Sequence, residues 1–371
     1  MVCCTSQDIA NLISGFQSFK INPILHFMVS HRFFLFCSTG IAEDLLTMLK
    51  AFLDEMPVFK NISFYIFCES YGGKMTSAFG VTLHQAIQKS EIECNFKGVA
   101  LGDSWISPID TVLTWGPYLY ALSLLDETDY NKVNQAANKT AKAFYDGDYN
   151  LSTKLWGVLE AVISETTDNV NVYNVLQHNV QSPFKKSMLM SSGKDVYLDK
   201  LYWQHVSQLQ QDNLSAFMNG PIRRKLRIIP DEVTWGGQSA NVFSHQSTDF
   251  MKPVIKEVSQ LLNLGLMVVV YEGQLDMICD TLGAEVWMNK LAWSKLKEFT
   301  TKTRQPLYPP SQREKKQTGA FVKEFDNLHF YYILKAGHMV PADAPEMALT
   351  MLTRILGTEN RNTENNTVLL V

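Results

Sequence analysis

The chain has 371 residues, of which 46% are apolar and 19% charged, an ordinary balance for a globular protein with a buried core. Disorder and low complexity are therefore excluded for most of its length. Its 33 Lys and Arg against 37 Asp and Glu give a net charge of −4. Because no basic excess is available to neutralise phosphates, nucleic acid is excluded as the main partner. The length allows two domains, or one large α/β domain with an insertion.

The six cysteines and the sequons bear on the compartment of the protein. No cysteine stands in a CxxC or Cys/His spacing typical of a zinc site, so we expect neither a metal nor a cofactor. The count allows free thiols or one or two disulfides, and Cys94 could pair with a partner that the sequence does not identify. Five Asn-x-Ser/Thr sequons lean mildly toward a secretory history: Asn61, Asn138, Asn150, Asn213 and Asn365.

The start of the chain shows no targeting pattern. It lacks the basic first segment and the unbroken apolar core of a signal peptide. The apolar stretch 23–37 is interrupted by His26, His31 and Arg32. No segment approaches the roughly 18 unbroken apolar residues of a transmembrane helix. We therefore expect no signal peptide and no membrane span.

From residue 41 onward, helices and strands are predicted to alternate. Apolar residues at helical spacing predict a helix over 41–52. The short apolar run SFYIFC predicts a buried strand over 63–68, and a helix over 74–89 and a strand over 96–101 follow it. This order of strand, turn, helix and strand is typical of a doubly wound parallel sheet.

The middle of the chain has a different pattern. Residues from about 115 to 230 are helix-rich and polar, which favours a helical cap inserted over the sheet rather than a second α/β domain. The aromatic run WGPYLY at 115–120 could line a substrate pocket or pack into the core. The sheet pattern then resumes with a helix over 251–264, a strand over 266–271, a helix over 282–291, an exposed loop over 300–318, a strand over 328–335 and a helix over 344–356 that ends at Gly357.

A sharp turn, Cys68-Glu69-Ser70-Tyr71-Gly72, joins the first predicted strand to its helix. The nucleophile elbow of α/β-hydrolases has the pattern G-x-S-x-G at this point, because its strained turn tolerates little bulk around the serine. Cysteine replaces the first glycine, and small residues are tolerated there. The alternative is an ordinary strand-to-helix turn in which the serine caps the helix.

Two later loops favour the elbow. In α/β-hydrolases the catalytic serine, acid and histidine follow one another in that chain order. Here the loop after strand 266–271 contains Asp276, and the loop after strand 328–335 contains His338. Both loops follow the carboxyl ends of strands, where open α/β sheets bind ligands. We therefore expect Ser70 as nucleophile, His338 as general base and then acid, and Asp276 as the orienting carboxylate. Asp280 is a competing acid that could instead be a surface charge.

Three long segments, FYIFCESYGGKM, YEGQLDMICDTLG and KAGHMVPADAPEMAL, resemble the serine carboxypeptidase family. The stretches CNFKGVALGDSWISPIDTVLTWGPYLY and MNGPIRRKLRIIPDEVTWGGQS are similar to its retinoid-inducible branch. The resemblance runs over residues 41–357. It implies an α/β-hydrolase fold, with a parallel-rich sheet flanked by helices and a helical cap at about 115–230. It also implies release of C-terminal amino acids from peptide or protein substrates, in a lysosomal or secreted setting.

The resemblance also assigns residues. Ser70, Asp276 and His338 match the family's nucleophile, acid and base, and the N–H of Tyr71 matches one donor of the oxyanion hole. Glu69 matches the acidic residue that helps to hold the terminal carboxylate of the substrate. A glutamate that faces a carboxylate favours a shared proton, which predicts activity at acidic pH. The alternative is that Glu69 only caps or pairs locally.

The chain departs from the family before the elbow. Residues 1–40 do not match it, and the family's W-x-x-G-G-P-G-x-S-S motif has no counterpart. The second oxyanion donor is therefore expected to be missing, a loss of about 2.7–4 kcal/mol in transition-state stabilisation. Strand 63–68 is expected to be an unpaired edge, with RFFLF at 32–36 as a candidate neighbour.

Three functions follow from this mixture of features. The first is a serine-type carboxypeptidase. The second is a truncated, catalytically impaired homologue that acts as a binding protein or has no function. The third is a related acyltransferase with the same triad and cap. The oligomeric state is not indicated by the sequence.

Overall fold

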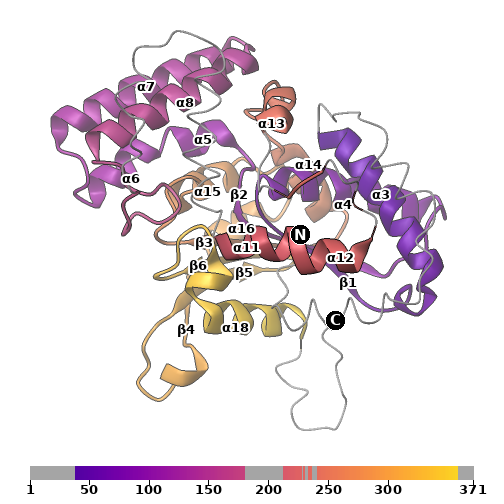
Figure 1. Ribbon diagram of the computed structural model, residues 1–371. Helices are drawn as coiled ribbons and strands as arrows, with labels where there is room; N and C mark the ends of the chain where they lie inside the picture. Colours follow the sequence, from indigo (N-terminus) through magenta and orange to yellow (C-terminus); the bar gives the residue numbers. More distant parts are fainter. Residues whose placement is uncertain (1–37, 180–211, 228, 230–232, 236–239, 358–371) are drawn as a thin grey trace. The chain divides into compact units, whose positions relative to one another are not determined.

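The computed structural model describes residues 38–179, 212–227, 229, 233–235 and 240–357 (Figure 1). They form two units: a larger one from residues 38–178 and 250–357, and a smaller one from the described residues between 179 and 249. The predictions for residues 1–37, including the strand at 32–36, and for the tail 358–371 lie outside the described residues.

A six-stranded sheet in the order β1-β2-β3-β6-β5-β4 organises the larger unit. The first four strands of this order are parallel neighbours, and the last two add antiparallel strands at one edge. The strands are β1 (Phe64–Ser70), β2 (Phe96–Ser104), β3 (Met267–Gly273), β4 (Gln305–Leu307), β5 (Ala320–Phe325) and β6 (Leu328–Ile333).

Two apolar clusters cover the two faces of this sheet. On β3, Val268 and Val270 belong to one cluster, whereas Val269 and Tyr271 belong to the other, as the alternation of a strand requires. Figure 1 shows α18 on the opposite side of the sheet from α4. The first cluster packs α3 (Ser38–Glu55), α4 (Gly72–Gln88), α14 (Ile255–Asn263), α15 (Thr281–Met288) and α16 (Leu296–Thr300) against the sheet, and the second packs α17 (Val340–Asp343) and α18 (Pro345–Ile355).

Four helices follow β2, of which the last three lie in the region 115–230 predicted as a cap. Asp126 and Asp148 each accept a backbone hydrogen bond at the start of a helix, from Asp129 N (2.8 Å) and Leu151 N (2.9 Å), and so mark where the two long helices begin. These two helices pack against each other (Figure 1). The four are α5 (Pro108–Val112), α6 (Trp115–Ala121), α7 (Glu127–Tyr145) and α8 (Tyr149–Thr166).

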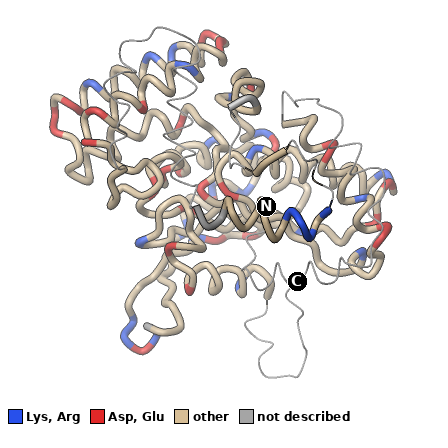
Figure 2. The backbone as a smooth tube through the Cα atoms, viewed as in Figure 1, with Lys and Arg blue, Asp and Glu red and all other residues tan. Residues whose placement is uncertain are grey.

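The smaller unit contains short helices. Its Asn219 side chain accepts from Trp235 N and donates to Trp235 O, both at 2.7 Å, which joins two of its segments. A stretch of three cations marks α12 in Figure 2. The helices are α11 (Asp212–Phe217), the π-helix η3 (Met218–Ile222), α12 (Arg223–Leu226) and α13 (Ala240–Gln246). The predicted bounds of the cap, 115–230, stay a prediction.

The four predicted strands all exist, and the strand predicted over 63–68 is an end strand of the sheet among the described residues. The expectation of a bare loop over 300–318 is wrong in part, because the loop contains β4. β5 was not predicted at all. It pairs with β6 through a tight turn at Asp326-Asn327, where Asp326 has a φ of 53°. Such Asx-containing turns are a hairpin signal.

Two other expectations are settled within the described residues. Trp115, the first residue of the aromatic run, is 0% exposed and therefore belongs to the core. Cys94 carries a free thiol, as do Cys68 and Cys279, so the pairing considered for Cys94 does not occur there. No helix in the described part of the chain is long and apolar enough to cross a membrane.

The burial of β2 gives a stability prediction. Leu101 on β2 is 0% exposed, so Leu101→Ala should lower the free energy of unfolding by about 2–5 kcal/mol through lost burial and a residual cavity. Leu349→Ala on α18, where the side chain is 58% exposed, should change it by less than about 0.5 kcal/mol. Urea denaturation followed by circular dichroism measures both values. Equal losses in the two variants would contradict the assignment of the core.

Candidate active site

Ser70 is the last residue of β1 and directly precedes the turn into α4. Its φ of 60° lies in the left-handed region that a serine rarely adopts. The turn is tight, because a Cβ added to Gly73 would lie 2.5 Å from Ser104 Cβ. The N-cap position of α4 is occupied by Tyr71, without a side-chain cap hydrogen bond, and not by Ser70. A strained serine at the end of a strand fits the nucleophile elbow better than a helix cap.

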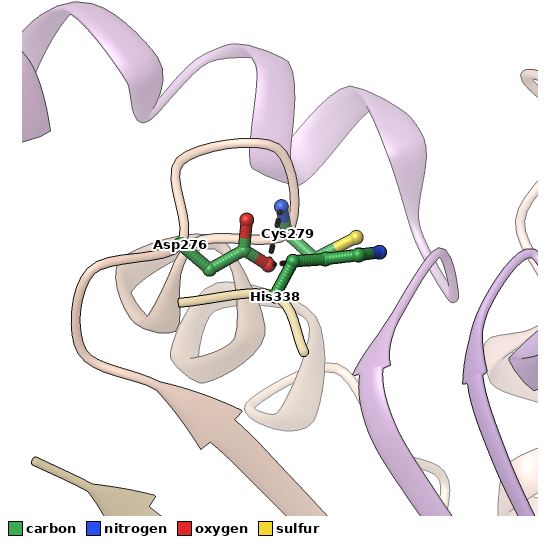
Figure 3. Close-up of side chains that lie close together, drawn as sticks. All are labelled: Asp276, Cys279 and His338. Carbon is green, nitrogen blue, oxygen red and sulfur yellow. Dashed lines mark hydrogen bonds and ion pairs between the residues drawn. The ribbon is translucent and has the colours of Figure 1, made fainter. Parts of the chain in front are cut away.

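Asp276 and His338 lie in direct contact. The Asp276 Oδ2 and His338 Nδ1 atoms are 2.8 Å apart, and the two residues are 0% and 4% exposed (Figure 3). The carboxylate is further fixed by two backbone donors, Ile278 N to Oδ1 at 3.0 Å and Cys279 N to Oδ2 at 3.2 Å. A carboxylate held in this way can orient an imidazole and leave its Nε2 free for proton transfer.

Asp280, the competing acid, has a different role. Its Oδ1 accepts from Gly283 N at 2.9 Å, which caps α15, and its Oδ2 accepts from Thr114 Oγ1 at 2.8 Å. The residue is 0% exposed, so the alternative of a surface charge is wrong.

The environment of His338 favours its charged form. Burial alone would lower the pKa of His338, but the charge and hydrogen bond of Asp276, aided by the charge of Glu69, raise it above its ordinary value.

The segment that follows α8 contacts two loops: the loop after β3 that contains Asp276, called the acid loop, and the loop after β6 that contains His338, called the base loop. We call residues 172–175 the strap. The Tyr173 ring lies against the His338 ring, with centroids 4.9 Å apart. The strap makes four main-chain bonds to the two loops: Met277 N and Ile278 N to Val172 O (3.0 and 3.1 Å), His338 N to Tyr173 O (2.8 Å) and Val175 N to Leu275 O (3.0 Å). Sequence reasoning missed the strap, since main-chain bonds leave no pattern of side chains.

Two glycines allow this close packing of backbones. A Cβ on Gly337 would lie 2.3 Å from Tyr173 O, and one on Gly273 would lie 2.2 Å from Gly337 O. Distances under 3.0 Å are not found for real Cβ atoms, so both positions need glycine.

Glu69 stands next to the serine with one carboxylate oxygen buried. Its Oε1 has no hydrogen-bond partner within the described chain. Burial raises the pKa of Glu69, the charge of His338 lowers it and that of Asp276 raises it, so that the pKa lies above its usual value. The alternative that Glu69 only caps a helix or pairs with a nearby group is therefore not observed for Oε1.

An aromatic cluster lies beside Tyr71 and was not predicted. The rings of Tyr71 and Phe250 are stacked at 6.2 Å with an interplanar angle of 5°. Phe250 also contacts Trp105 at 5.3 Å and Trp156 of α8 at 4.7 Å. From the predicted aromatic run, the Tyr118 hydroxyl donates to Gln274 O in the acid loop at 2.7 Å. The cluster joins residues far apart in the chain, which is why local patterns do not reveal it.

Cys279 completes a group of metal-ligand type with Asp276 and His338 (Figure 3). One ligand atom from each of the three lies within 4.8 Å of the others. However, the Asp276 Oδ2 and His338 Nδ1 atoms already bind each other. Burial and the charge of Asp276 raise the pKa of the Cys279 thiol well above its usual value, so the thiolate that a metal prefers is disfavoured. The group fits an acid–base pair better than a metal site.

Comparison with known proteins agrees with this geometry. The family model for serine carboxypeptidases matches residues 34–358. The chain belongs to the serine carboxypeptidase family. It is 49% identical over 312 residues to the retinoid-inducible serine carboxypeptidase of Rattus norvegicus. This match covers 84% of this chain and 68% of the relative. A serine carboxypeptidase-like protein of Arabidopsis thaliana is 38% identical over 322 residues, 85% of this chain and 69% of that protein.

Comparison with solved structures bears on the fold. A prohormone-processing carboxypeptidase from Saccharomyces cerevisiae superposes with a TM-score of 0.71 at 18% identity, covering 87% of this chain and 68% of the other. The predicted α/β-hydrolase fold is confirmed by this likeness and by the mixed sheet with helices on both faces. The resemblance of 41–357 to the serine carboxypeptidase family is confirmed as well.

The buried contact between acid and base gives a second prediction. Asp276→Asn removes the charge that raises the pKa of His338 and leaves burial, which lowers it. The pKa of His338 should therefore be lower in the variant than in the wild type. Titration of the histidine C–H signals by NMR measures the change, with His329 as an internal reference because its partner is Glu324. An unchanged His338 titration would contradict the ion pair.

Proposed function

We propose that this chain is a serine-type carboxypeptidase that releases C-terminal amino acids from peptides through an acyl-enzyme on Ser70. The observation that carries the proposal is the buried 2.8 Å bond between Asp276 and His338, in a chain whose strained Ser70 ends a parallel strand of the same sheet. The order of the three residues is that of an α/β-hydrolase triad.

The steps follow from the proposed roles. The Ser70 hydroxyl attacks the scissile carbonyl while His338 Nε2 takes its proton, and Asp276 stabilises the imidazolium that forms. The tetrahedral oxyanion accepts a hydrogen bond from Tyr71 N–H. His338 then gives the proton to the departing amino group, which leaves the acyl group on Ser70. Water, activated by His338, hydrolyses this ester and restores the serine.

Glu69 is proposed to select free C-termini. A protonated Glu69 can donate a hydrogen bond to the terminal carboxylate of a peptide, whereas an ionised Glu69 repels it. Because burial raises the pKa of Glu69, the proton is retained to higher pH than in an exposed glutamate. Binding of the substrate should therefore weaken as the pH rises through the pKa of Glu69.

The catalytically impaired homologue remains the second proposal. It rests on the sequence-based expectation that one oxyanion donor is missing, and on the position of β1 as the end strand among the described residues. Loss of one oxyanion donor costs about a hundredfold to a thousandfold in turnover. The acyltransferase shares the triad, and no specific observation favours it.

A lysosomal or secreted setting is part of the same proposal. The sequon residues Asn61, Asn138 and Asn150 are exposed, as glycan attachment requires. Expression in a secretory host followed by glycosidase treatment tests it through a loss of apparent mass.

A fluorophosphonate probe separates the first two functions. The wild-type chain should be labelled, Ser70→Ala should not be labelled, and His338→Ala should react at least about a hundredfold more slowly, because the serine loses its base. Cooperative unfolding must be shown for each protein, so that a lack of labelling is not a folding defect. A folded wild-type chain without labelling would identify the impaired homologue. A blocked peptide ester offered with an acceptor alcohol then distinguishes hydrolysis from acyl transfer.

Glu69→Gln tests the role of the carboxyl group. The amide can donate a hydrogen bond at any pH, so the rise of KM for a peptide with increasing pH should disappear, while the effect of pH on kcat should persist. The profile of kcat/KM for peptides with free and amidated C-termini measures both. If the variant keeps the acid preference of the wild type for free C-termini, Glu69 does not hold the substrate carboxylate.

A further inference from the structure

Two buried carboxyl groups lie side by side beneath the acid loop. Asp103 is the penultimate residue of β2, and Glu272 is the penultimate residue of β3. The residues before them, Gly102 and Tyr271, are register partners on parallel strands, so the two carboxyl groups occupy the same level of the sheet. Asp103 is 0% and Glu272 is 1% exposed. The proposed mechanism uses neither of them.

Each of the two side chains has an oxygen that lacks a donor. Asp103 Oδ1 accepts from Gly273 N at 2.7 Å, whereas Asp103 Oδ2 and Glu272 Oε2 are buried with no partner that donates within the described residues. The register of β2 and β3 brings the two side chains together on neighbouring strands, and each changes the pKa of the other. Ionised carboxylates only accept hydrogen bonds, so a hydrogen bond between the two needs a proton on one of them. A single proton satisfies both oxygens.

The charged groups around the pair are acidic. Glu69 faces it from β1, and Asp276 and Asp280 face it from the loop after β3, where the Cys279 thiol also lies. On β6 the register partner of Glu272 is Tyr332, whose hydroxyl donates to Glu285. Burial first, and then the charge of Asp276, raise the pKa of Asp103 and of Glu272 well above their usual values.

Asp103 also holds the point where the acid and base loops meet. Asp103 has a φ of 38°. It lies where the register between β1 and β2 shifts, between the pairs Glu69–Gly102 and Ser70–Ser104. It accepts a hydrogen bond from the N–H of Gly273, the last residue of β3. Gly273 itself is packed against Gly337 O, directly before His338. The carboxyl group therefore fixes Gly273, on which the acid loop and the base loop both depend.

We propose that Asp103 and Glu272 share one proton and act as a positioning pair, which holds Gly273 and thereby the acid loop in place and loses this hold when the proton leaves. The shared proton is independent of the proposed function, and its effect on Ser70 rests on that function. Since unfolded carboxyl groups ionise near pH 4, the pair contributes its full stability below about that pH. The contribution is lost as the pH rises through the pKa of the folded pair.

The pH dependence of the free energy of unfolding gives the number of protons released on unfolding, and so tests whether the pair holds one. The free energy of unfolding is measured for the full chain at intervals between acidic and mildly alkaline pH, for the wild type, Asp103→Asn and Glu272→Gln. In Asp103→Asn the amide still accepts from Gly273 N–H and donates to the Glu272 carboxylate, so the folded charge equals that of the protonated pair. Unfolding of the wild type should release about one proton more near pH 6.5 than unfolding of either variant. Asp326→Asn, at an exposed turn, is the charge control and should resemble the wild type.

The positioning role is read from probe labelling of Ser70. Asp103→Ala removes the bond to Gly273 N–H and should slow labelling by at least about tenfold at acidic pH, whereas Asp103→Asn should stay within about threefold. The ratio of the labelling rates of wild type and Asp103→Asn should fall as the pH rises.

Three results would overturn the inference. Equal proton release by the wild type and both amide variants would show that no proton is shared. Labelling of Asp103→Asn as slow as that of Asp103→Ala, or a ratio that does not change with pH, would refute the positioning role. If Asp103→Asn does not fold, Glu272→Gln decides the proton count. If the folded wild type is not labelled at all, the proposed function fails, while the proton count still decides the pair.

Discussion

The hydrogen bond between Asp276 and His338 is the interaction on which the rest of the site depends. A carboxylate with no exposed surface is costly unless donors surround it, and here the imidazole and two backbone N–H groups supply them. Those donors lie on two loops, which must therefore keep their positions relative to each other. The strap, with main-chain bonds to both loops, and the two glycines that allow backbones to touch maintain those positions.

The sequence predicted the parts of this arrangement that local patterns carry. Apolar runs placed the four parallel strands, and the residues after their ends placed Ser70, Asp276 and His338, because loops at the carboxyl ends of parallel strands share one edge of the sheet. The assignment of their roles stays a prediction. The strand β5 was missed because its pattern is short and interrupted by charges, although the turn at Asp326 gave a usable signal.

The remaining parts could not be predicted for physical reasons. The strap is defined by main-chain bonds, which any sequence can make. The stacking of Phe250 on Tyr71 joins residues 179 positions apart, and periodicity has no information over that distance. Asp103 and Glu272 lie at neighbouring positions only because of the register between β2 and β3. A shift of one residue would have placed the two side chains on opposite faces of the sheet. Asp280 looked like Asp276 in sequence, and only its bonds to Gly283 and Thr114 distinguish it.

The course of α8 couples the two sides of the site. Through Trp156 the helix contacts Phe250, which stacks on Tyr71 beside the serine. The chain that leaves the end of α8 continues into the strap, where Tyr173 O accepts a hydrogen bond from His338 N. A replacement in α8 that moves Trp156 is therefore expected to disturb both the surroundings of Tyr71 and the strap that holds the main chain of His338.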